Sequence, residues 1–260
     1  MIMAVDIGNT HIKMGAWDED SLVFVSRLQT NLLRTRDEYA IDLLNILRLQ
    51  ECNSTQFDGA IISSVVPALS RTVQEAVGEV IQTKRVYLVG PGLKTGLDIK
   101  IDDPATLGSD MVCAAVAALH KFTMPCIIIS MGTATAVFAL DKDGAFLGGS
   151  VCAGVNISLE ALSRRTAQLP LISLEEPGNV IGTNTVDSIK SGVIYGTAGM
   201  LDSMVVRMKE LLGEDTFVVA SGGLAGPITG YCRQKIHVDE LLVLEGLRLI
   251  YHKNAKKPSR

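Results

Sequence analysis

The stretch Met3-Ala-Val-Asp-Ile-Gly-Asn-Thr-His-Ile-Lys13 decides how this chain is organised. An apolar run, Ile2–Val5, leads to a carboxylate at Asp6. A glycine and two small polar residues follow, and a second apolar run extends over Ile12–Trp17. This order predicts a strand, a tight turn and a second strand.

The residues of this turn have the chemistry of a phosphate site. Gly8 lets the backbone turn and approach a ligand without a Cβ in the way. Asn9 and Thr10 supply side-chain and backbone donors of the kind that cradle phosphate. Asp6 can hold Mg²⁺ directly or through water, because Mg²⁺ in proteins usually takes one or two carboxylates beside phosphate oxygens. A β-hairpin with a polar turn and no ligand explains the same residues.

The pattern recurs in the second half of the chain. Cys126–Ile129 is an apolar strand, Ser130-Met-Gly-Thr-Ala-Thr135 a small polar turn, and Ala136–Leu140 another strand. A repeat of this length indicates two similar domains rather than a solenoid. We place the boundary near Pro125, which gives domains 1–122 and 123–260. Two facing turns of this kind can hold one polyphosphate, so the repeat favours a nucleotide site.

Strands alternate with helices along the rest of the chain, which predicts an α/β fold with a mixed sheet covered by helices. Further strands are expected at 22–28, 59–66, 85–89, 145–149 and 216–220. Helices are expected at 37–49, 67–81, 109–121, 154–167, 184–212 and 239–251. Residues 253–260 form a basic tail that we expect to be frayed.

Composition narrows the class of partner. The chain has 24 basic and 28 acidic residues, and no basic stripe indicates binding of nucleic acid. Its apolar runs are too short to cross a bilayer, and its start carries no basic region before a long apolar segment. Five scattered cysteines, three of them in apolar contexts, indicate core positions and reduced thiols in a cytoplasmic protein.

Three features allow a functional and a structural interpretation. Asp110 lies at a predicted helix start, where Ser109 is a candidate N-cap and the dipole favours a carboxylate; it is a catalytic candidate or a capping residue. Gly222 and Gly223 follow a strand and either receive a flat ring or form a plain turn. Three glycines lie on one face of the helix 184–212, at 192, 196 and 199, and indicate either a dimer contact or internal packing.

Six motifs together resemble the type III pantothenate kinase family over nearly the whole chain. They are Asp6-Ile-Gly-Asn-Thr-His-Ile-Lys13, Gly108-Ser-Asp110, Gly132-Thr-Ala134, Gly182-Thr-Asn-Thr185, Ser221-Gly-Gly223 and Leu244-Glu-Gly-Leu-Arg248. The resemblance implies an actin-like fold of two ribonuclease-H-like domains with ATP between them, and a homodimer. It also implies transfer of the γ-phosphoryl group of ATP to pantothenate, the first committed step towards coenzyme A.

The resemblance also implies roles for individual residues. Asp110 matches the general base, and Gly108, Ser109, Asp110, Met111 and Thr185 match substrate contacts. The ATP and phosphate contacts are Asp6, Ile7, Gly8, Asn9, Thr10, His11, Ile12 and Lys13 in the first loop, Gly132 and Thr133 in the second, and Gly222 and Gly223. Mg²⁺ is expected on Asp6 through water, and K⁺ or NH₄⁺ at the position of Ser130.

The chain departs from the family pattern at three positions. Met111 stands where the family has Arg, which removes a forked donor suited to a carboxylate or phosphate; a hydrogen bond to a charged group is worth about 1.5–3 kcal/mol. Ser130 replaces the Asp of the monovalent-cation site, which leaves that site without its formal charge. Ile101 stands where many members have Tyr.

These departures leave three hypotheses. The protein is a pantothenate kinase with altered cation dependence, a kinase of the same fold for another small hydroxyl compound, or a catalytically impaired paralogue that acts as a nucleotide-binding, regulatory or interaction protein. The presence of Asp6 and Asp110 favours retained chemistry, and Met111 and Ser130 argue against ordinary activity.

Overall fold

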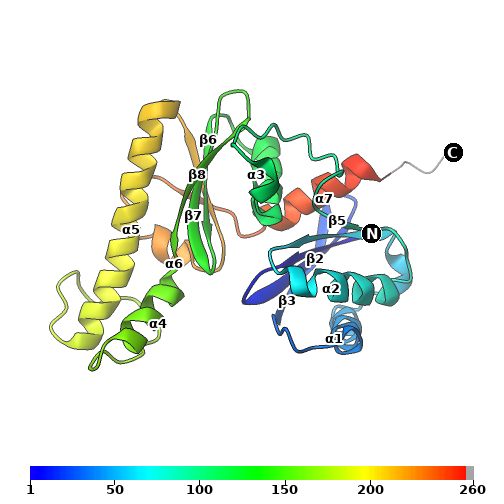
Figure 1. Ribbon diagram of the computed structural model, residues 1–260, viewed down its shortest axis with the longest axis horizontal. Helices are drawn as coiled ribbons and strands as arrows, with labels where there is room; N and C mark the ends of the chain where they lie inside the picture. The colour runs from blue at the N-terminus through cyan, green and yellow to red at the C-terminus, as the bar shows by residue number, and fades with distance from the viewer. Residues whose placement is uncertain (256–260) are drawn as a thin grey trace. The chain divides into compact units, whose positions relative to one another are not determined.

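The computed structural model describes residues 1–255 (Figure 1). The chain divides into two compact units. The first unit comprises Met1–Leu97, Asp103–His120 and the described residues from Leu241 onward. The second comprises Asp98–Asp102 and Lys121–Glu240.

The first unit is built on a mixed five-stranded sheet. Its strands are β1 (Ile2–Ile7), β2 (His11–Asp18), β3 (Ser21–Gln29), β4 (Gly59–Ser64) and β5 (Val86–Leu88). They lie in the order β3-β2-β1-β4-β5. The first three form an antiparallel meander, and β4 and β5 continue the sheet in parallel with β1.

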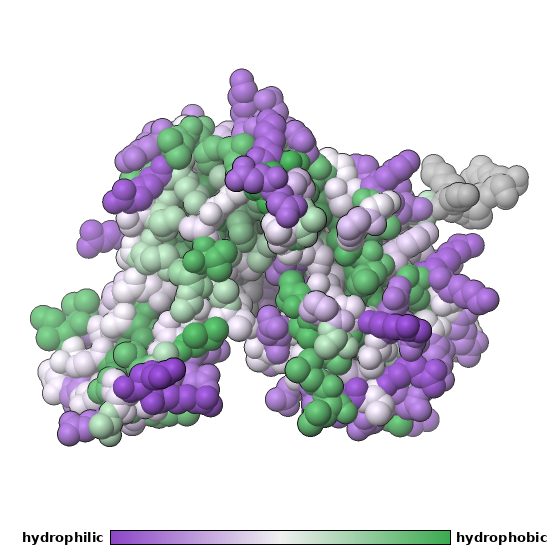
Figure 2. Space-filling model, viewed as in Figure 1, coloured by the Kyte–Doolittle hydropathy of each residue, from purple (hydrophilic) through white to green (hydrophobic). Residues whose placement is uncertain are grey.

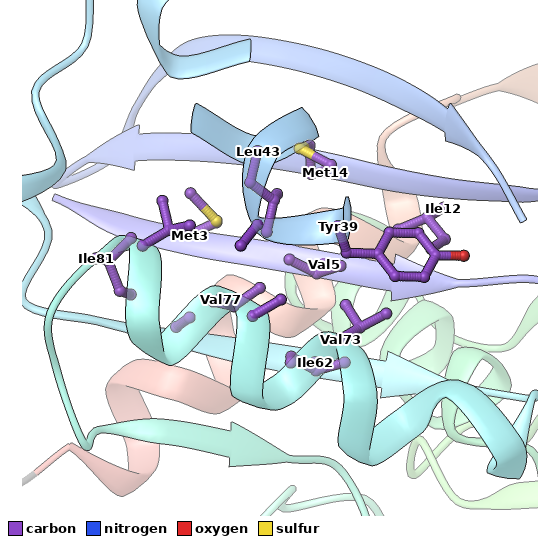
Figure 3. Packing of buried hydrophobic residues seen from close by; sticks show 14 of the residues in the cluster. Met3, Val5, Ile12, Met14, Tyr39, Leu43, Ile62, Val73, Val77 and Ile81 are labelled. Carbon is purple, nitrogen blue, oxygen red and sulfur yellow. The ribbon is translucent and has the colours of Figure 1, made fainter. Parts of the chain in front are cut away.

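Helices cover both faces of this sheet. The helices of the unit are α1 (Arg36–Leu49), α2 (Pro67–Val80), α3 (Ser109–Lys121) and α7 (Leu242–Asn254), with short 3₁₀ turns η1 (Ser54–Gln56) and η2 (Pro104–Thr106). Met3 and Val5 of β1 point towards Leu43 of α1 and Val77 of α2 in one hydrophobic core (Figure 3). Because side chains alternate along a strand, Asp6 belongs to the opposite face, which α7 contacts at β1.

The second unit repeats the same plan. Its strands are β6 (Cys126–Met131), β7 (Ala134–Leu140), β8 (Phe146–Ala153), β9 (Phe217–Ser221) and β10 (His237–Val238), in the order β10-β9-β6-β7-β8. Three helices, α4 (Val155–Arg165), α5 (Thr185–Leu212) and α6 (Ala225–Thr229), share a core with β6, β7 and β9. Read from its own first strand, each sheet has the order 3-2-1-4-5 with the same parallel and antiparallel pairs. The predicted duplication and the α/β class are therefore confirmed.

The structure differs from the sequence-based expectation in a few elements. The helix expected at 239–251 is α7, and it groups with the first unit rather than with residues 123–240. Leu244, Leu247 and Ile250 are fully buried. The apolar face of this helix is therefore covered by its packing in the first unit. The helix α6 and the strand β10 were not predicted because both are very short. The predicted frayed tail lies mostly outside the described residues, although Lys253 and Asn254 end α7.

The surface carries hydrophobic residues among the polar ones, seen as green areas on the face drawn in Figure 2. Leu33, Leu211 and Ile181 are among the most exposed large hydrophobic side chains. Within residues 1–255 no helix combines the length and the apolar character needed to cross a lipid bilayer. All five cysteines are free, but only Cys113 and Cys126 are fully buried, one fewer than expected.

Candidate active site

Three polar residues form a row across the first sheet where β1 ends. Asp6 of β1 is the direct partner of Lys13 on β2 and of Ser63 on β4. Partners in neighbouring strands present their side chains on the same face, so the three groups are neighbours. They lie on the face opposite the core of α1 and α2. The apolar strands on either side of Asp6 thereby fix a carboxylate between an ammonium group and a hydroxyl group.

The helix α3 begins beside this row and is fastened to β4. The Ser109 hydroxyl oxygen lies 3.0 Å from the Ser63 hydroxyl oxygen, accepts the Ser64 N–H at 2.9 Å, and lies 3.1 Å from the Ser64 carbonyl oxygen. The prediction that Ser109 is the N-cap is wrong. Ser109 is the first residue of the helix, and its hydroxyl bonds to the neighbouring strand instead of to its own first turn.

Asp110 follows Ser109 in the first turn of α3. Its Oδ1 atom accepts the Met111 N–H at 2.9 Å. Burial raises the pKa of Asp110 above its ordinary value, and the backbone N–H groups of Met111 and of Asp110 itself oppose that rise. The helix start therefore does stabilise the carboxylate, as expected, but burial outweighs it.

Asp6 is the most perturbed carboxyl group of this site. Burial, then repulsion from Asp110, raises the pKa of Asp6 from 3.8 to about 7, and a hydrogen bond from Ser63 and the charge of Lys13 act in the opposite direction. Its Oδ1 atom is buried and has no hydrogen-bond partner among residues 1–255. This repulsion indicates that Asp6 and Asp110 lie near each other, although they are far apart in the sequence.

A divalent cation fits these groups. The uncompensated Oδ1 of Asp6 offers a ligand atom, and a nearby cation holds a buried carboxylate ionised. Mg²⁺ needs only one or two carboxylates because water and phosphate oxygens complete its shell. The described residues contain no group of three or more His, Cys, Asp or Glu side chains placed to hold a metal. Any ion here would thus depend on Asp6 and on a bound phosphate.

The turn that follows β1 is fixed by hydrogen bonds to its carbonyl and N–H groups, and its central residues are exposed. Gly8 donates its N–H to the His11 carbonyl oxygen at 3.0 Å, and the Thr30 hydroxyl donates to the Gly8 carbonyl oxygen at 2.6 Å. Asn9, Thr10 and His11 are exposed. Ile7 and Ile12, by contrast, are buried in the core and close the base of the turn.

The second unit places its own turn residues together. Gly132 donates its N–H to the Ala134 carbonyl oxygen at 3.0 Å, and the Thr133 carbonyl oxygen accepts the Gly154 N–H at 3.2 Å. Gly222 has φ of 110°, and a Cβ there would lie 2.3 Å from the carbonyl oxygen of Met131. Gly222 must therefore be glycine for structural reasons.

The remaining candidates of this unit lie around the same strands. Gly223 is exposed beside Gly222, in the turn before α6. Ser130 lies at the end of β6, opposite Ala136 of β7 and Ser221 of β9.

Thr185 lies elsewhere in the second unit, in an open cavity of about 940 Å³. Asn184 is the N-cap of α5 and accepts the Asp187 N–H at 2.9 Å, which makes Thr185 the first helical residue. Side chains of α4, α5 and the end of β8 line the cavity, among them Leu162, Val193 and Met200.

Ser63 and Ser64 were missed by the sequence analysis. A signal was available, because two serines end an otherwise apolar strand, Ala60-Ile-Ile62. Ligands in open α/β sheets bind beyond the carboxyl ends of the parallel strands, so polar residues at such an end are candidates.

The comparisons of the sequence with known proteins point to one family. A sequence model of type III pantothenate kinase matches residues 2–207. A type III pantothenate kinase from Exiguobacterium sp. is 41% identical over 256 residues, which are 98% of this chain and 100% of that protein.

Solved structures with the same fold are more distant. An activator of 2-hydroxyisocaproyl-CoA dehydratase from Clostridium difficile, with bound ADPNP, has a TM-score of 0.60 at 12% identity, covering 100% of this chain and 99% of that one. A putative 2-dehydro-3-deoxygalactonokinase from Sinorhizobium meliloti has a TM-score of 0.59 at 13% identity, with coverage of 100% and 99%. These likenesses confirm the predicted actin-like fold.

Proposed function

Because this chain belongs to the type III pantothenate kinase family, we propose that it transfers the γ-phosphoryl group of ATP to pantothenate in coenzyme A biosynthesis. The observation that carries the proposal is the pair of buried carboxylates, Asp6 and Asp110. Asp6 lies near the end of β1, before the exposed turn Asn9–His11, and Asp110 lies in the first turn of α3. Phosphoryl transfer depends on positioning and on neutralising charge, which two such groups can serve.

Asp6 would hold Mg²⁺, directly or through water. The bound ion supplies positive charge to the β- and γ-phosphate oxygens. The buried, unpartnered Oδ1 atom supports this role. The exposed Asn9, Thr10 and His11 would contact the phosphates through side-chain and backbone donors. Lys13 would help to hold Asp6 ionised, because its charge lowers the pKa of that carboxyl group.

Asp110 would act as the general base. A carboxylate within hydrogen-bond distance of the acceptor hydroxyl can take its proton as the oxygen attacks phosphorus. Burial raises the pKa of Asp110 towards the working range of a base. The turn Gly108–Met111 would bind the acceptor beside this carboxylate. Thr185 would supply a further acceptor contact, and its place in a cavity of about 940 Å³ supports that role.

Gly132 and Thr133 would contact ATP in the second unit, and Gly222 and Gly223 would lie against the nucleotide. The hairpin turn at Gly132 has the same position in its sheet as the turn at Gly8 has in the first, since both follow the first strand of a duplicated sheet. Gly223 is exposed and carries no side chain that would exclude a ring.

The direct test measures ADP formation by the purified protein with ATP and Mg²⁺, with and without pantothenate. Pantothenate-dependent ADP release and its loss in Asp110→Asn are the expected results. ADP formation that other hydroxylated acids stimulate and pantothenate does not would assign a different acceptor. This second candidate is favoured by Met111, an uncharged residue beside the base where the family has Arg.

The monovalent cation is tested separately. Ser130 offers one hydroxyl and no formal charge, so we propose that K⁺ and NH₄⁺ bind weakly and that exchanging Na⁺ for K⁺ changes the rate little. Ser130→Asp should introduce K⁺ activation. Strong K⁺ activation of the unchanged protein would show that other ligands suffice.

We also propose that the protein is a homodimer that uses α5. Gly192, Gly196 and Gly199 are exposed, and a Cβ at each would meet no atom of the described residues within 4 Å. Internal packing therefore does not explain these glycines, whereas close approach of a second copy does. Sedimentation of the protein should give the dimer mass, and Gly196→Lys should shift it towards the monomer.

A further inference from the structure

We propose that the paired hydroxyl groups of Ser63 and Ser109 position the general base of this enzyme, and that Ser109 serves this purpose rather than contacting the acceptor with its side chain. The inference deepens the proposed function and rests on it for the role of Asp110. It concerns how the first turn of α3 is held at a fixed place beside β1.

The first step of the argument is the geometry at Ser109. Three polar atoms of β4 lie within 3.1 Å of its hydroxyl oxygen: the Ser63 hydroxyl, the Ser64 N–H and the Ser64 carbonyl. A serine hydroxyl has one proton to donate and two lone pairs to accept with. Its one proton and one of its lone pairs are therefore used within the protein, so this hydroxyl has no proton left to donate to a substrate.

The second step concerns the direction of the bonds. Ser63 is completely buried, and as the strand partner of Asp6 it presents its hydroxyl beside that carboxyl group. When Asp6 is ionised, Ser63 must donate its single proton to that carboxylate. Ser109 then accepts from the Ser64 N–H, and its single proton is shared between the Ser63 oxygen at 3.0 Å and the Ser64 carbonyl oxygen at 3.1 Å. A continuous chain of hydrogen bonds thus joins the phosphate-loop carboxylate to the first residue of α3.

The third step is the consequence for Asp110. Asp110 follows Ser109 directly in the first turn of α3, so the bonds of Ser109 to β4 fix the place of Asp110. Two buried carboxyl groups that repel each other keep their positions only if other bonds hold them; we call the hydrogen bonds that do so a tether. The Ser109 hydroxyl supplies that tether, since it bonds to the strand next to the one that carries Asp6. A displacement of about 1 Å can lower the rate of a positioned reaction by about 100-fold.

A matched control lies on the other face of the same strand. The Ser70 hydroxyl of α2 bonds to the Ser64 hydroxyl at 2.8 Å and to the Val66 carbonyl oxygen at 3.2 Å. Ser70→Ala and Ser109→Ala each remove one hydroxyl from the group of serines around Ser64. Only Ser109 bonds towards the carboxylates, so only its loss should affect catalysis.

The experiment compares Ser109→Ala, Ser109→Thr and Ser70→Ala in steady-state kinetics. We expect kcat to fall about 10-fold or more in Ser109→Ala, with KM for ATP changed by less than about threefold, because the loss concerns the transition state. Ser109→Thr keeps the hydroxyl and should recover most of kcat, and Ser70→Ala should resemble the parent. Equal losses in Ser109→Ala and Ser70→Ala, or no recovery in Ser109→Thr, would overturn the proposal.

A second measurement does not depend on the substrate. Hydrogen exchange of the peptide that spans residues 108–113 reports opening of the first turn of α3. Ser109→Ala should speed this exchange, and Ser70→Ala should leave it unchanged. If pantothenate is not the acceptor, the kinetics fail in the parent protein as well, but this difference in exchange remains. Parental exchange in Ser109→Ala would refute the tether whatever the acceptor is.

Discussion

The substitution Asp6→Asn should make the protein more stable at alkaline pH while removing its activity. Asn has nearly the shape of Asp but stays neutral, so it avoids placing a charge in a buried site. Activity should be lost because an amide is a poor ligand for Mg²⁺ beside phosphate. Stability and activity therefore move in opposite directions at this one residue.

The size of the effect follows from the pKa of Asp6. Its pKa is about 7 in the folded protein and 3.8 as a reference value, a difference of about 3 units. One unit corresponds to about 1.4 kcal/mol, so ionisation reduces the free energy of unfolding by about 4 kcal/mol at most. This is an upper bound because the residue as a whole is only partly buried.

The sign follows from the raised pKa. Below pH 3.8 the carboxyl group is protonated in both states and contributes no pH dependence. Between pH 3.8 and about 7 the unfolded state releases its proton first, so stability falls as pH rises. Above this window the loss is constant. Asp6→Asn should therefore exceed the parent in stability at pH 8, and the difference should vanish near pH 4.

Urea unfolding at several pH values in a metal-free buffer measures this difference. The exposed Asp18→Asn, at the end of β2 in the same sheet, is the matched control and should follow the parent at every pH. Adding Mg²⁺ with ATP should stabilise the parent more than Asp6→Asn. An Asp6→Asn variant that is no more stable than the parent at pH 8 would refute the reasoning.

Three further substitutions test the packing that supports the site. Gly246→Ala places a Cβ 1.8 Å from the Cys113 carbonyl oxygen, where α7 crosses α3; it should lower the free energy of unfolding by about 3 kcal/mol, the upper end for overpacking, in urea titration. Gly222→Ala places a side chain at a positive φ and a Cβ 2.3 Å from the Met131 carbonyl oxygen. We expect the free energy of unfolding to fall by about 3 kcal/mol. Calorimetry should also show weaker ATP binding. Asn184→Ala removes the N-cap of α5 and should reduce the free energy of unfolding by about 1 kcal/mol. A parental value in any of these measurements would contradict the corresponding contact.

Local patterns predicted most of the secondary structure well. The predicted helix 37–49 is α1 at Arg36–Leu49, and Pro67 begins α2 as expected. These elements were predictable because apolar periodicity and Pro chemistry act over a few residues. Short elements such as β10 were missed because two residues carry no periodic signal.

The candidate site was predictable in part. Asp6 and the turn Gly8–His11 follow from the order of an apolar strand, a carboxylate and small polar residues. The roles of Asp6 and Asp110 were assigned by the family resemblance, and no local pattern joins residues so far apart in the sequence. Ser63 was not predicted. Its place beside Asp6 depends on the register between the parallel strands β1 and β4, which only folding establishes.

The two duplicated halves follow from local sequence, since the repeated strand-turn-strand pattern is local and each copy folds into the same order of strands. Three features depend on contacts between distant parts of the chain: α7 completes the first unit, Asp110 in the first turn of α3 lies near Asp6, and Ser109 bonds to β4 rather than capping its own helix. The physical reason is that packing and burial join residues distant in the chain. Those contacts set the charge state and the direction of each polar group, which a local pattern does not contain.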